Sequence, residues 1–376
     1  METKTKRRLH WGLVAALMLP LVLIGLFEWL KGSRAAMDFW VFEVLAPVEQ
    51  LWGRLWSLFP LSGMELLIAM FLLWNVVWLG RTAVLALRNR VWRDTARRIA
   101  VLAAAWLWLW CALCWLWNAA YYAATFSERS GLSVEQYSVE ELAAVTEYFA
   151  QQTAELSGQV SRDGEGHFLS DREKYLTDGV GVYRNLEQEF PCLKMEPVEA
   201  KPILCSRLQS RLGFTGMYFP FTGEANVNID APACLMPSTI AHEMAHQRMV
   251  ASELEASFVG IAACITGDDV VFQYSGYLEG LIHLCNALYS VDAQAWYDIA
   301  DRYFTPELST DWRDNNAYWK ALESGVEEAA EQAYDSFLKG NDQELGMRSY
   351  GACVDLLVAY FGARADGNTA IQYDIS

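Results

Sequence analysis

Long apolar stretches dominate the first third of the chain. Predominantly apolar runs occupy residues 11–30, 64–80 and 99–121, and each falls within the roughly 17–25 residues that an α-helix needs to cross a bilayer. Basic residues precede the first run, as they also do in a signal peptide, but this run is longer than the roughly 7–15 apolar residues of such a peptide. We therefore predict a transmembrane region of three retained spans over residues 1–121.

Between the first two spans, residues 37–61 place apolar side chains at helical spacing, interrupted by Glu43, Glu49, Gln50 and Arg54. Charges recur too often for a further span. The pattern predicts an amphipathic helix that lies along the membrane interface.

The polar residues 122–138 predict a linker, and helices are predicted over 139–156 and 171–190. Each helix begins with a capping box, in which a serine hydroxyl and a glutamate three residues later satisfy free backbone groups: Ser138 with Glu141, and Ser170 with Glu173.

Helical periodicity stops at residues 191–237, where prolines, glycines and short apolar runs take over. Residues 214–230 predict two short strands, interrupted at Pro220–Gly223. After Pro237 the pattern is helical to about residue 360, with breaks near 251, 267, 291, 305, 324 and 341. The predicted fold class is therefore mainly α: a three-helix transmembrane region, then an α+β domain over 139–376 with a small β element and a mostly helical C-terminal part.

Charge divides the chain at the same boundary as hydropathy. Residues 1–121 carry 13 Lys and Arg against 7 Asp and Glu, whereas residues 122–376 carry 16 against 39. A strongly acidic domain repels phosphates, so we exclude nucleic acid as a partner. Residues 81–98 hold six arginines and one aspartate, and basic loops stay cytoplasmic. We therefore expect a multi-pass protein of the cell membrane, in contact with the lipid bilayer, whose N-terminus is cytoplasmic and whose acidic domain faces outward.

Of the eight cysteines, six lie in the acidic part. In an exported domain they permit up to three disulfides, and buried free thiols remain the alternative.

A histidine pair in residues 239–258 suggests chemistry in a chain with only five histidines. His242 and His246 are four positions apart, so on a helix both rings can reach one metal ion. Zinc suits neutral imidazoles, and a catalytic zinc site keeps one position open for water. Glu243 lies beside the pair, where it can act as general base towards that water. The motif HExxH is short, and two ordinary core histidines are the alternative.

A third zinc ligand requires the chain to turn after His246, because on a continuous helix Glu253 would lie ~10 Å further along the axis. Ser252 and Glu255 have the spacing of another capping box, which predicts a second helix that begins at Ser252. Glu253 shares a face of this helix with the small residues Ala256, Ser257, Gly260 and Cys264, which permit close helix packing. We predict Glu253 as the third ligand, with Glu255 as the alternative.

These residues resemble the zincin metallopeptidases, and more closely a bacterial membrane family named domain of unknown function 3810. The similarity covers nearly the whole chain and is carried by four segments: FPFTGEANVN (219–228), HEMAHQ (242–247), ELEASF (253–258) and FQYSGYLEGL (272–281). In gluzincins a Glu-x-x-Ala-Asp-like segment supplies the third ligand, and residues 253–257 fit it with serine in the last place. The resemblance implies a zincin-like fold for 139–376. Met249 stands where a glycine is expected, which puts the geometry of the turn in doubt.

Further site residues are predicted by analogy with zincins, each with a structural alternative. Strand 224–229 is a candidate to hold an extended peptide, with Glu224, Asn226 and Asn228 on its polar face; a plain hairpin facing water is the alternative. Candidates to stabilise the oxyanion are Tyr274, Tyr277 and His283. The alternative is that each is only a packing residue. Asp268 and Asp269 are candidates to orient a zinc-bound imidazole, or they cap the next helix.

The sequence thus predicts a membrane-anchored zinc metallopeptidase that hydrolyses a peptide or protein substrate outside the cytoplasm, with Zn²⁺ as cofactor. Two alternatives remain open. One is a membrane sensor or scaffold without enzymatic activity that retains a structural metal site. The other is a zinc hydrolase that cleaves a non-peptide amide of the cell envelope.

Overall fold

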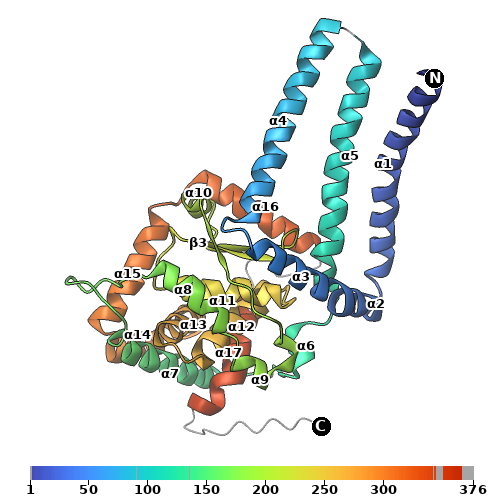
Figure 1. The fold of residues 1–376 in the computed structure, drawn as a ribbon. Coiled ribbons are helices and arrows are strands. Elements are labelled where there is room, and N and C mark those ends of the chain that lie inside the picture. The colour runs from blue at the N-terminus through green and yellow to red at the C-terminus, as the bar shows by residue number, and fades with distance from the viewer. Residues whose placement is uncertain (1, 90, 135, 342, 344–349, 366–376) are drawn as a thin grey trace.

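The computed structural model describes residues 2–89, 91–134, 136–341, 343 and 350–365 (Figure 1). Three long helices project from one side of the body: α1 (Glu2–Leu30), α4 (Gly63–Asn89) and α5 (Trp92–Leu116). Among the described residues, three helical segments are long and apolar enough to cross a membrane: Trp11–Leu30, Gly63–Arg88 and Trp92–Tyr122. The three predicted spans are thus found as helices with the length and composition needed to cross a membrane, and the second and third extend beyond their predicted apolar runs.

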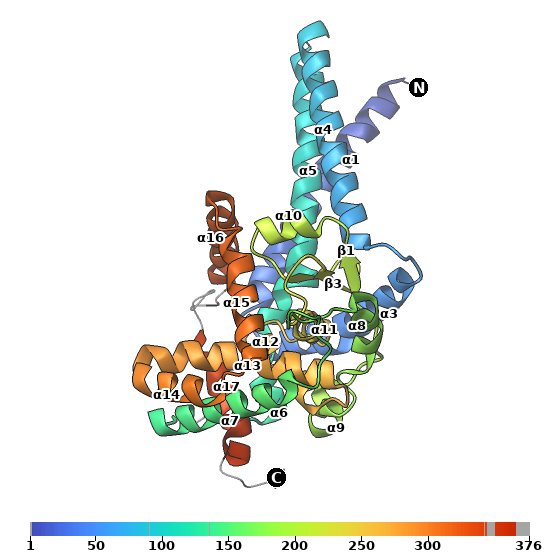
Figure 2. The same ribbon diagram turned by 90° about the vertical axis from the view of Figure 1, so that its left-hand side faces the viewer.

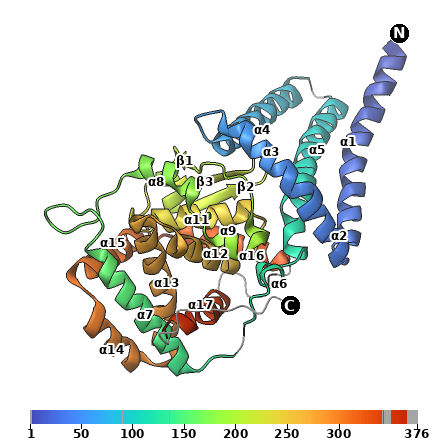
Figure 3. The same ribbon diagram turned by 60° about the horizontal axis from the view of Figure 1, so that its bottom comes forward.

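The segment predicted to lie along the interface forms α2 (Arg34–Asp38), a π-helical stretch (Phe39–Leu45) and α3 (Ala46–Ser57). Figure 3 shows α2 and α3 crossing the domain-side ends of the long helices, beside the sheet. Glu49 of α3 is buried and accepts a hydrogen bond from the Tyr218 hydroxyl. The exposed side of α3 and of the residues after it is apolar: Val48, Leu51, Trp52, Leu55, Leu58 and Phe59. This helix thus packs its polar side on the domain and leaves its apolar side uncovered.

The predicted linker contains a helix that packs into the domain. A short 3-10 helix (Asn118–Tyr122) extends α5, and α6 (Phe126–Ser130) follows, capped by a Thr125–Glu128 capping box. Phe126 is buried, and its ring lies 5.3 Å from Phe190 and 5.9 Å from Phe258 between centroids. Residues 122–130 therefore attach the membrane helices to the domain through packed side chains.

Helix α7 (Val139–Ser157) and its capping box at Ser138 confirm the first predicted helix of the domain. The second is divided into α8 (Arg172–Asp178), a 3-10 turn and α9 (Leu186–Glu189), and Asp171 rather than Ser170 caps it. Gly179 explains the break, because a Cβ at this position would lie 2.7 Å from the Ile240 side chain. Close contact with the next layer requires glycine here, and glycine weakens a helix.

A three-stranded sheet covers the helix that carries the histidine pair. It contains β1 (Lys201–Ile203), β2 (Gly216–Phe219) and β3 (Glu224–Asn228) in the order β1-β3-β2, with β1 parallel and β2 antiparallel to β3. The two predicted strands are confirmed. The sequence did not predict β1, which has three residues and a proline, both unusual for a strand.

Helices follow the sheet with the predicted breaks. They are α11 (Met236–Gln247), α12 (Glu253–Thr266), α13 (Val270–Val291), α14 (Ala293–Tyr303), α15 (Pro306–Lys320), α16 (Gly325–Gly340) and α17 (Tyr350–Ala365); α10 (Ser206–Arg211) precedes β2. The last part of the predicted domain, residues 366–376, lies outside the described residues. Figures 1 and 2 show α7, α14 and α17 on the side of the body far from the membrane helices.

Two buried clusters organise the packing. The larger one contains most of the domain, including α7, α11, α12 and α13. The second joins the two parts that hydropathy separated, because Phe27 and Trp117 of the membrane region pack there with Tyr218 and Met249 of the domain. All eight cysteines lie among the described residues and are free thiols. Of the two alternatives for the cysteines, the structure therefore shows free thiols.

A buried ion pair fixes the loop between α3 and α4 on the sheet. Lys201 Nζ lies 2.5 Å from Glu224 and donates to the carbonyls of Trp56 and Leu61 at 2.7 and 3.0 Å. Lys201→Met is expected to lower the free energy of unfolding by about 3–5 kcal/mol, because it leaves a buried carboxylate unpaired. Chemical unfolding of the full chain in detergent micelles measures this. Arg54→Ala is the matched control, since its exposed pair with Glu196 contributes about 0–1 kcal/mol. Equal effects of the two changes would contradict the prediction.

Candidate metal centre

Helix α11 carries the two histidines one turn apart, as predicted. Their ring centroids lie 4.9 Å apart and the ring planes are nearly perpendicular. His246 is buried, whereas His242 is partly exposed. Around them α11 buries nearly all its other residues beneath the sheet, which holds the two rings in one orientation.

The chain reverses direction at Met249, the position where the sequence led us to expect glycine. Met249 has φ of 59°, in the left-handed region, which costs a non-glycine residue roughly 1–2 kcal/mol. Its side chain is 3% exposed and packs in the second cluster. Burying a methionine contributes a similar amount, about 1.5–3 kcal/mol, so packing offsets the strain. The departure from glycine therefore does not prevent the turn.

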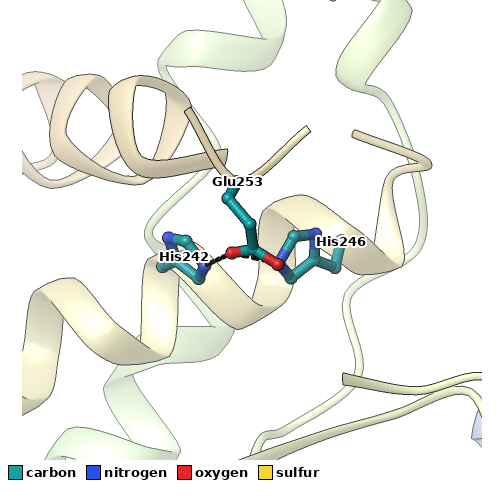
Figure 4. Close-up of side chains that lie close together, drawn as sticks. All are labelled: His242, His246 and Glu253. Atoms are coloured by element: carbon teal, nitrogen blue, oxygen red, sulfur yellow. Dashed lines mark hydrogen bonds and ion pairs between the residues drawn. The ribbon is translucent and has the colours of Figure 1, made fainter. Parts of the chain in front are cut away.

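After this turn, α12 places Glu253 between the two imidazoles (Figure 4). Its Oε2 atom lies 3.1 Å from His242 Nε2 and 3.5 Å from His246 Nε2. The three residues form a group whose ligand atoms all lie within 4.8 Å of one another. The other oxygen, Oε1, accepts a hydrogen bond from the Tyr334 hydroxyl of α16. The carboxylate is therefore oriented from a second helix.

Glu255 points elsewhere. Its carboxylate accepts hydrogen bonds from the backbone N–H groups of Phe126 and Ser127, at 2.7 and 2.9 Å, and from the Ser127 hydroxyl at 2.8 Å. Glu255 of α12 thus caps the N-terminus of α6. Ser252 is the N-cap residue of α12 but makes no side-chain capping bond. The predicted capping box between Ser252 and Glu255 was wrong, although the helix begins where the box placed it.

Hydrogen bonds fix which imidazole nitrogens face the carboxylate. His246 Nδ1 lies 2.7 Å from the Val250 carbonyl oxygen, which only accepts, so Nδ1 carries the proton. His242 Nδ1 lies 3.3 Å from the Ser257 hydroxyl. In a neutral His246 ring the lone pair of Nε2 then points at a negatively charged oxygen 3.5 Å away. Such a contact needs a cation or a proton between the two atoms.

This donor set fits zinc. Tetrahedral ligands at about 2.0–2.1 Å from Zn²⁺ lie about 3.4 Å from one another. The two nitrogen–oxygen separations, 3.1 and 3.5 Å, bracket that value. The residue types, two imidazoles and one carboxylate, are those of catalytic zinc sites.

The same contacts shift the acid–base properties of the site. Burial alone would lower the pKa of His246, but the Glu253 carboxylate raises it to about 9. Burial alone would raise the pKa of Glu253, but His246 and His242 hold it well below its usual range. The imidazole pair therefore retains a positive charge next to the Glu253 carboxylate. A divalent cation can replace this positive charge.

Glu243 lies under β2. It is 4% exposed, and burial raises its pKa, although the neighbouring histidines and the Tyr218 backbone N–H act in the opposite direction. A Cβ on Gly216 would come within 2.5 Å of a Glu243 carboxylate oxygen, so glycine is needed where the strand crosses this side chain. A buried carboxylate with a raised pKa, adjacent to the metal ligands, has the properties of a general base.

A cavity of about 150 Å³ opens beside His242 and is lined mainly by polar side chains: Thr215, Ser238, Thr239, Ser257, Glu279 and His283. The His283 ring, one of the predicted oxyanion donors, thus shares a cavity with His242, and its Nε2 lies 3.5 Å from Glu279.

The two tyrosines predicted to stabilise the oxyanion are used in other contacts. Tyr274 is fully buried and donates to Asp311, which also forms a bidentate pair with Arg162 at 2.7 and 3.0 Å. The Tyr277 hydroxyl lies 3.1 Å from that of Tyr148. The structure does not bring either hydroxyl to the histidine pair, because one bonds a residue of α15 and the other a residue of α7.

The two aspartates predicted to orient an imidazole act at the start of α13 instead. Asp269 caps that helix and lies 3.5 Å from Lys174, whereas Asp268 accepts a hydrogen bond from Asn185. The partners of the ring nitrogens are the Val250 carbonyl and the Ser257 hydroxyl. Asp269 therefore has the role that the alternative predicted, capping the next helix.

The predicted substrate contacts of β3 conflict with its position. Glu224, Asn226 and Asn228 are at most 1% exposed, and β3 is paired on both edges, by β1 and by β2. Asn226 accepts a hydrogen bond from Ser62 at 2.6 Å, and Asn228 donates to the Phe214 carbonyl at 2.8 Å. A central strand has no free edge for a peptide, so these polar side chains hold the fold together.

Three aromatic residues near the metal ligands were not predicted. Trp117 packs edge-on against the His246 ring at 5.4 Å, and Tyr218 lies 6.4 Å from the same ring. Tyr334 bonds Glu253, and burial together with that carboxylate raises the pKa of the phenol well above its usual range. Tyr334 is 81 residues from Glu253 in sequence, and hydropathy assigns Trp117 to a membrane span. No local pattern assigns either to the site.

Tyr334→Phe tests whether α16 supports the metal centre. We expect zinc affinity to fall roughly 10–100-fold, the effect of losing an outer partner of a metal ligand. Isothermal titration of the metal-free full chain in detergent measures the change. Tyr318→Phe removes a hydroxyl that bonds Ser210 and Asp230 instead, and should leave affinity unchanged.

Close packing of α12 on α11 depends on Gly260. A Cβ there would lie 2.8 Å from the His242 backbone nitrogen, so Gly260→Ala must push the two helices apart. We expect a loss of about 1–3 kcal/mol in unfolding free energy, together with weaker zinc binding because Glu253 moves with α12. Gly158→Ala is the control, since a Cβ there meets nothing within 4 Å. Unchanged zinc affinity in Gly260→Ala would show that the site tolerates helix displacement.

Comparison with known families agrees with the resemblance to domain of unknown function 3810. Residues 42–358 match the family described as Protein of unknown function (DUF3810). The chain belongs to this family. No match was found among curated proteins or among solved structures. The match begins within the segment before α3 and ends in α17, so family membership covers the second and third membrane helices as well as the metal centre.

Proposed function

We propose that this DUF3810 protein is a membrane-anchored zinc metallopeptidase. His242, His246 and Glu253 would hold the zinc ion, and Glu243 would act as general base. The observation that carries the proposal is the convergence of two Nε2 atoms on one carboxylate oxygen, at nitrogen–oxygen separations close to those of zinc ligands, next to a buried glutamate.

Bound zinc would lower the pKa of water and polarise the carbonyl group of the scissile amide. Glu243 accepts a proton from the attacking water, whose oxygen bonds to the carbonyl carbon. The carbon–nitrogen bond then breaks, and Glu243 returns the proton to the leaving nitrogen. One water is consumed, and the products are a carboxylate and an amine.

The Arg-rich segment supports an outward-facing site. Residues 81–98 carry six arginines and one aspartate, at the end of α4 and α5 far from the domain. By the charge rule this end would face the cytoplasm, and the acidic domain with its candidate metal centre would lie on the other side of the membrane. Zinc and extracellular polypeptides would both have access there.

The test uses the zinc-loaded full chain in detergent micelles or nanodiscs, because Trp117 of the membrane region contacts His246. The protein is incubated with a mixture of peptides, and new termini are identified by mass spectrometry, with and without a zinc chelator. Stoichiometric zinc and chelator-sensitive cleavage are expected. Absence of zinc would refute the proposal. Bound zinc with no cleavage, and unfolding on chelation, would favour the sensor or scaffold instead, and cleavage confined to non-peptide envelope amides would favour the other hydrolase.

A further inference from the structure

The metal centre lies directly at the ends of the membrane helices. Trp117, one residue beyond α5, contacts the His246 ring. Its indole N–H donates to the Tyr121 hydroxyl at 3.1 Å, and the Tyr121 ring lies 6.4 Å from Phe337 of α16. The helix that supplies Tyr334 to Glu253 therefore also packs on the end of the third span. A substrate at this site is close to the bilayer surface.

An edge strand runs from the metal centre towards the membrane. β2 begins at Gly216, which lies against Glu243, and ends at Phe219. One edge of β2 pairs with β3, and among the described residues no strand pairs with the other edge. At about 3.3 Å per residue, Phe219 lies roughly 10 Å along the strand from Gly216. An extended chain that pairs with this edge would cover the same path.

At the far end of β2 the strand meets an apolar groove between two membrane helices. The groove has a volume of about 720 Å³ and is lined by Phe219 and Phe221 together with apolar residues of α4 and α5, among them Phe71, Trp106 and Leu109. The Trp52 indole donates to the Phe221 carbonyl at 2.6 Å. This bond fixes the turn after β2 to the apolar side of α3, at the predicted level of the membrane interface.

We propose that the substrate is a polypeptide anchored in the same membrane. Its apolar anchor would lie in the groove between α4 and α5, and its first residues outside the bilayer would pair with β2 and reach the metal centre. This inference rests on the proposed peptidase function. The continuity between groove and strand edge favours a polypeptide over a lipid, because an acyl chain would fill the groove without using the edge. From the length of β2, cleavage is expected about 3–8 residues from the anchor.

Recognition is tested without catalysis, in full-length Glu243→Gln protein in phosphatidylcholine nanodiscs. A photoreactive benzophenone side chain at position 221 reports what occupies the groove, and one at position 76, exposed on α4, is the control. The probe is a single-span peptide with a flexible extension of about 15 residues on the side of the domain. We expect at least tenfold more peptide cross-linking from position 221 than from position 76. Cross-links only to lipid, or equal yields at the two positions, would overturn the proposal.

Cleavage by the zinc-loaded wild-type chain separates this inference from the peptidase proposal. We expect the anchored peptide to be cut at least tenfold faster than the same extension without its span. When the sequence of the extension is shifted along the peptide, the cleavage position should stay at the same number of residues from the anchor. Leu109→Trp, which fills the groove, should slow only the anchored peptide and leave zinc content unchanged. Equal rates for both peptides would support the peptidase but refute membrane anchoring. Cross-linking without cleavage of either peptide would refute the peptidase and leave recognition supported.

Discussion

Glu253→Gln is expected to abolish stoichiometric zinc binding, whereas Glu255→Gln should leave it intact. Glu253 Oε2 contacts both imidazoles, and the substitution removes the negative charge that attracts the metal. Losing an outer partner of a ligand costs roughly 10–100-fold in affinity, so losing the ligand itself should cost more. Zinc content after dialysis of the full chain, followed by titration with zinc, measures both variants.

The two glutamates form a matched pair because they are two residues apart on the same helix. Glu255 accepts three hydrogen bonds from Phe126 and Ser127, so Glu255→Gln should instead weaken the docking of α6. Hydrogen bonds to charged groups contribute about 1.5–3 kcal/mol, and we expect a loss of that order in unfolding free energy. If Glu255→Gln released zinc and Glu253→Gln retained it, the assignment of the third ligand would be reversed.

Local sequence patterns predicted the features that depend only on the geometry of one helix or of two consecutive helices. Apolar runs of sufficient length identified the three candidate membrane spans, and the spacing of His242 and His246 predicted that both imidazoles lie on one face of α11. Glu253 was predicted because the chain had to turn, and the small residue Gly260 allowed α12 to return beside α11. These inferences needed only helix geometry and side-chain size.

Contacts between distant segments were not predictable in the same way. The polar alternation of β3 indicated one face in water, but residues 57–64, about 160 positions earlier, cover that face and bond Glu224 and Asn226. Glu255 fits a capping box by sequence, yet its partners lie about 130 residues away. Trp117 belongs to a membrane span by hydropathy and to the metal centre by position. In each example the sequence shows the chemical group but not the surface that covers it.

Glu243→Gln is expected to lower kcat for any cleaved peptide by roughly 10²–10⁴-fold, the contribution typical of a general base. Glutamine keeps the size of the side chain and cannot accept a proton from water, while the zinc ligands are untouched. Burial of a neutral amide is also less costly than burial of a charge, and Glu243 is only 4% exposed, so unfolding stability should be equal or higher.

Steady-state kinetics and zinc analysis of the same Glu243→Gln preparation test this, with Glu255→Gln as a control for the chemical change at another buried glutamate. Loss of activity in Glu243→Gln with zinc retained would separate catalysis from metal binding, because the base acts on the proton and the ligands act on the ion. Wild-type activity in Glu243→Gln would refute the assignment of Glu243 as general base, even if the three ligands bind zinc as expected.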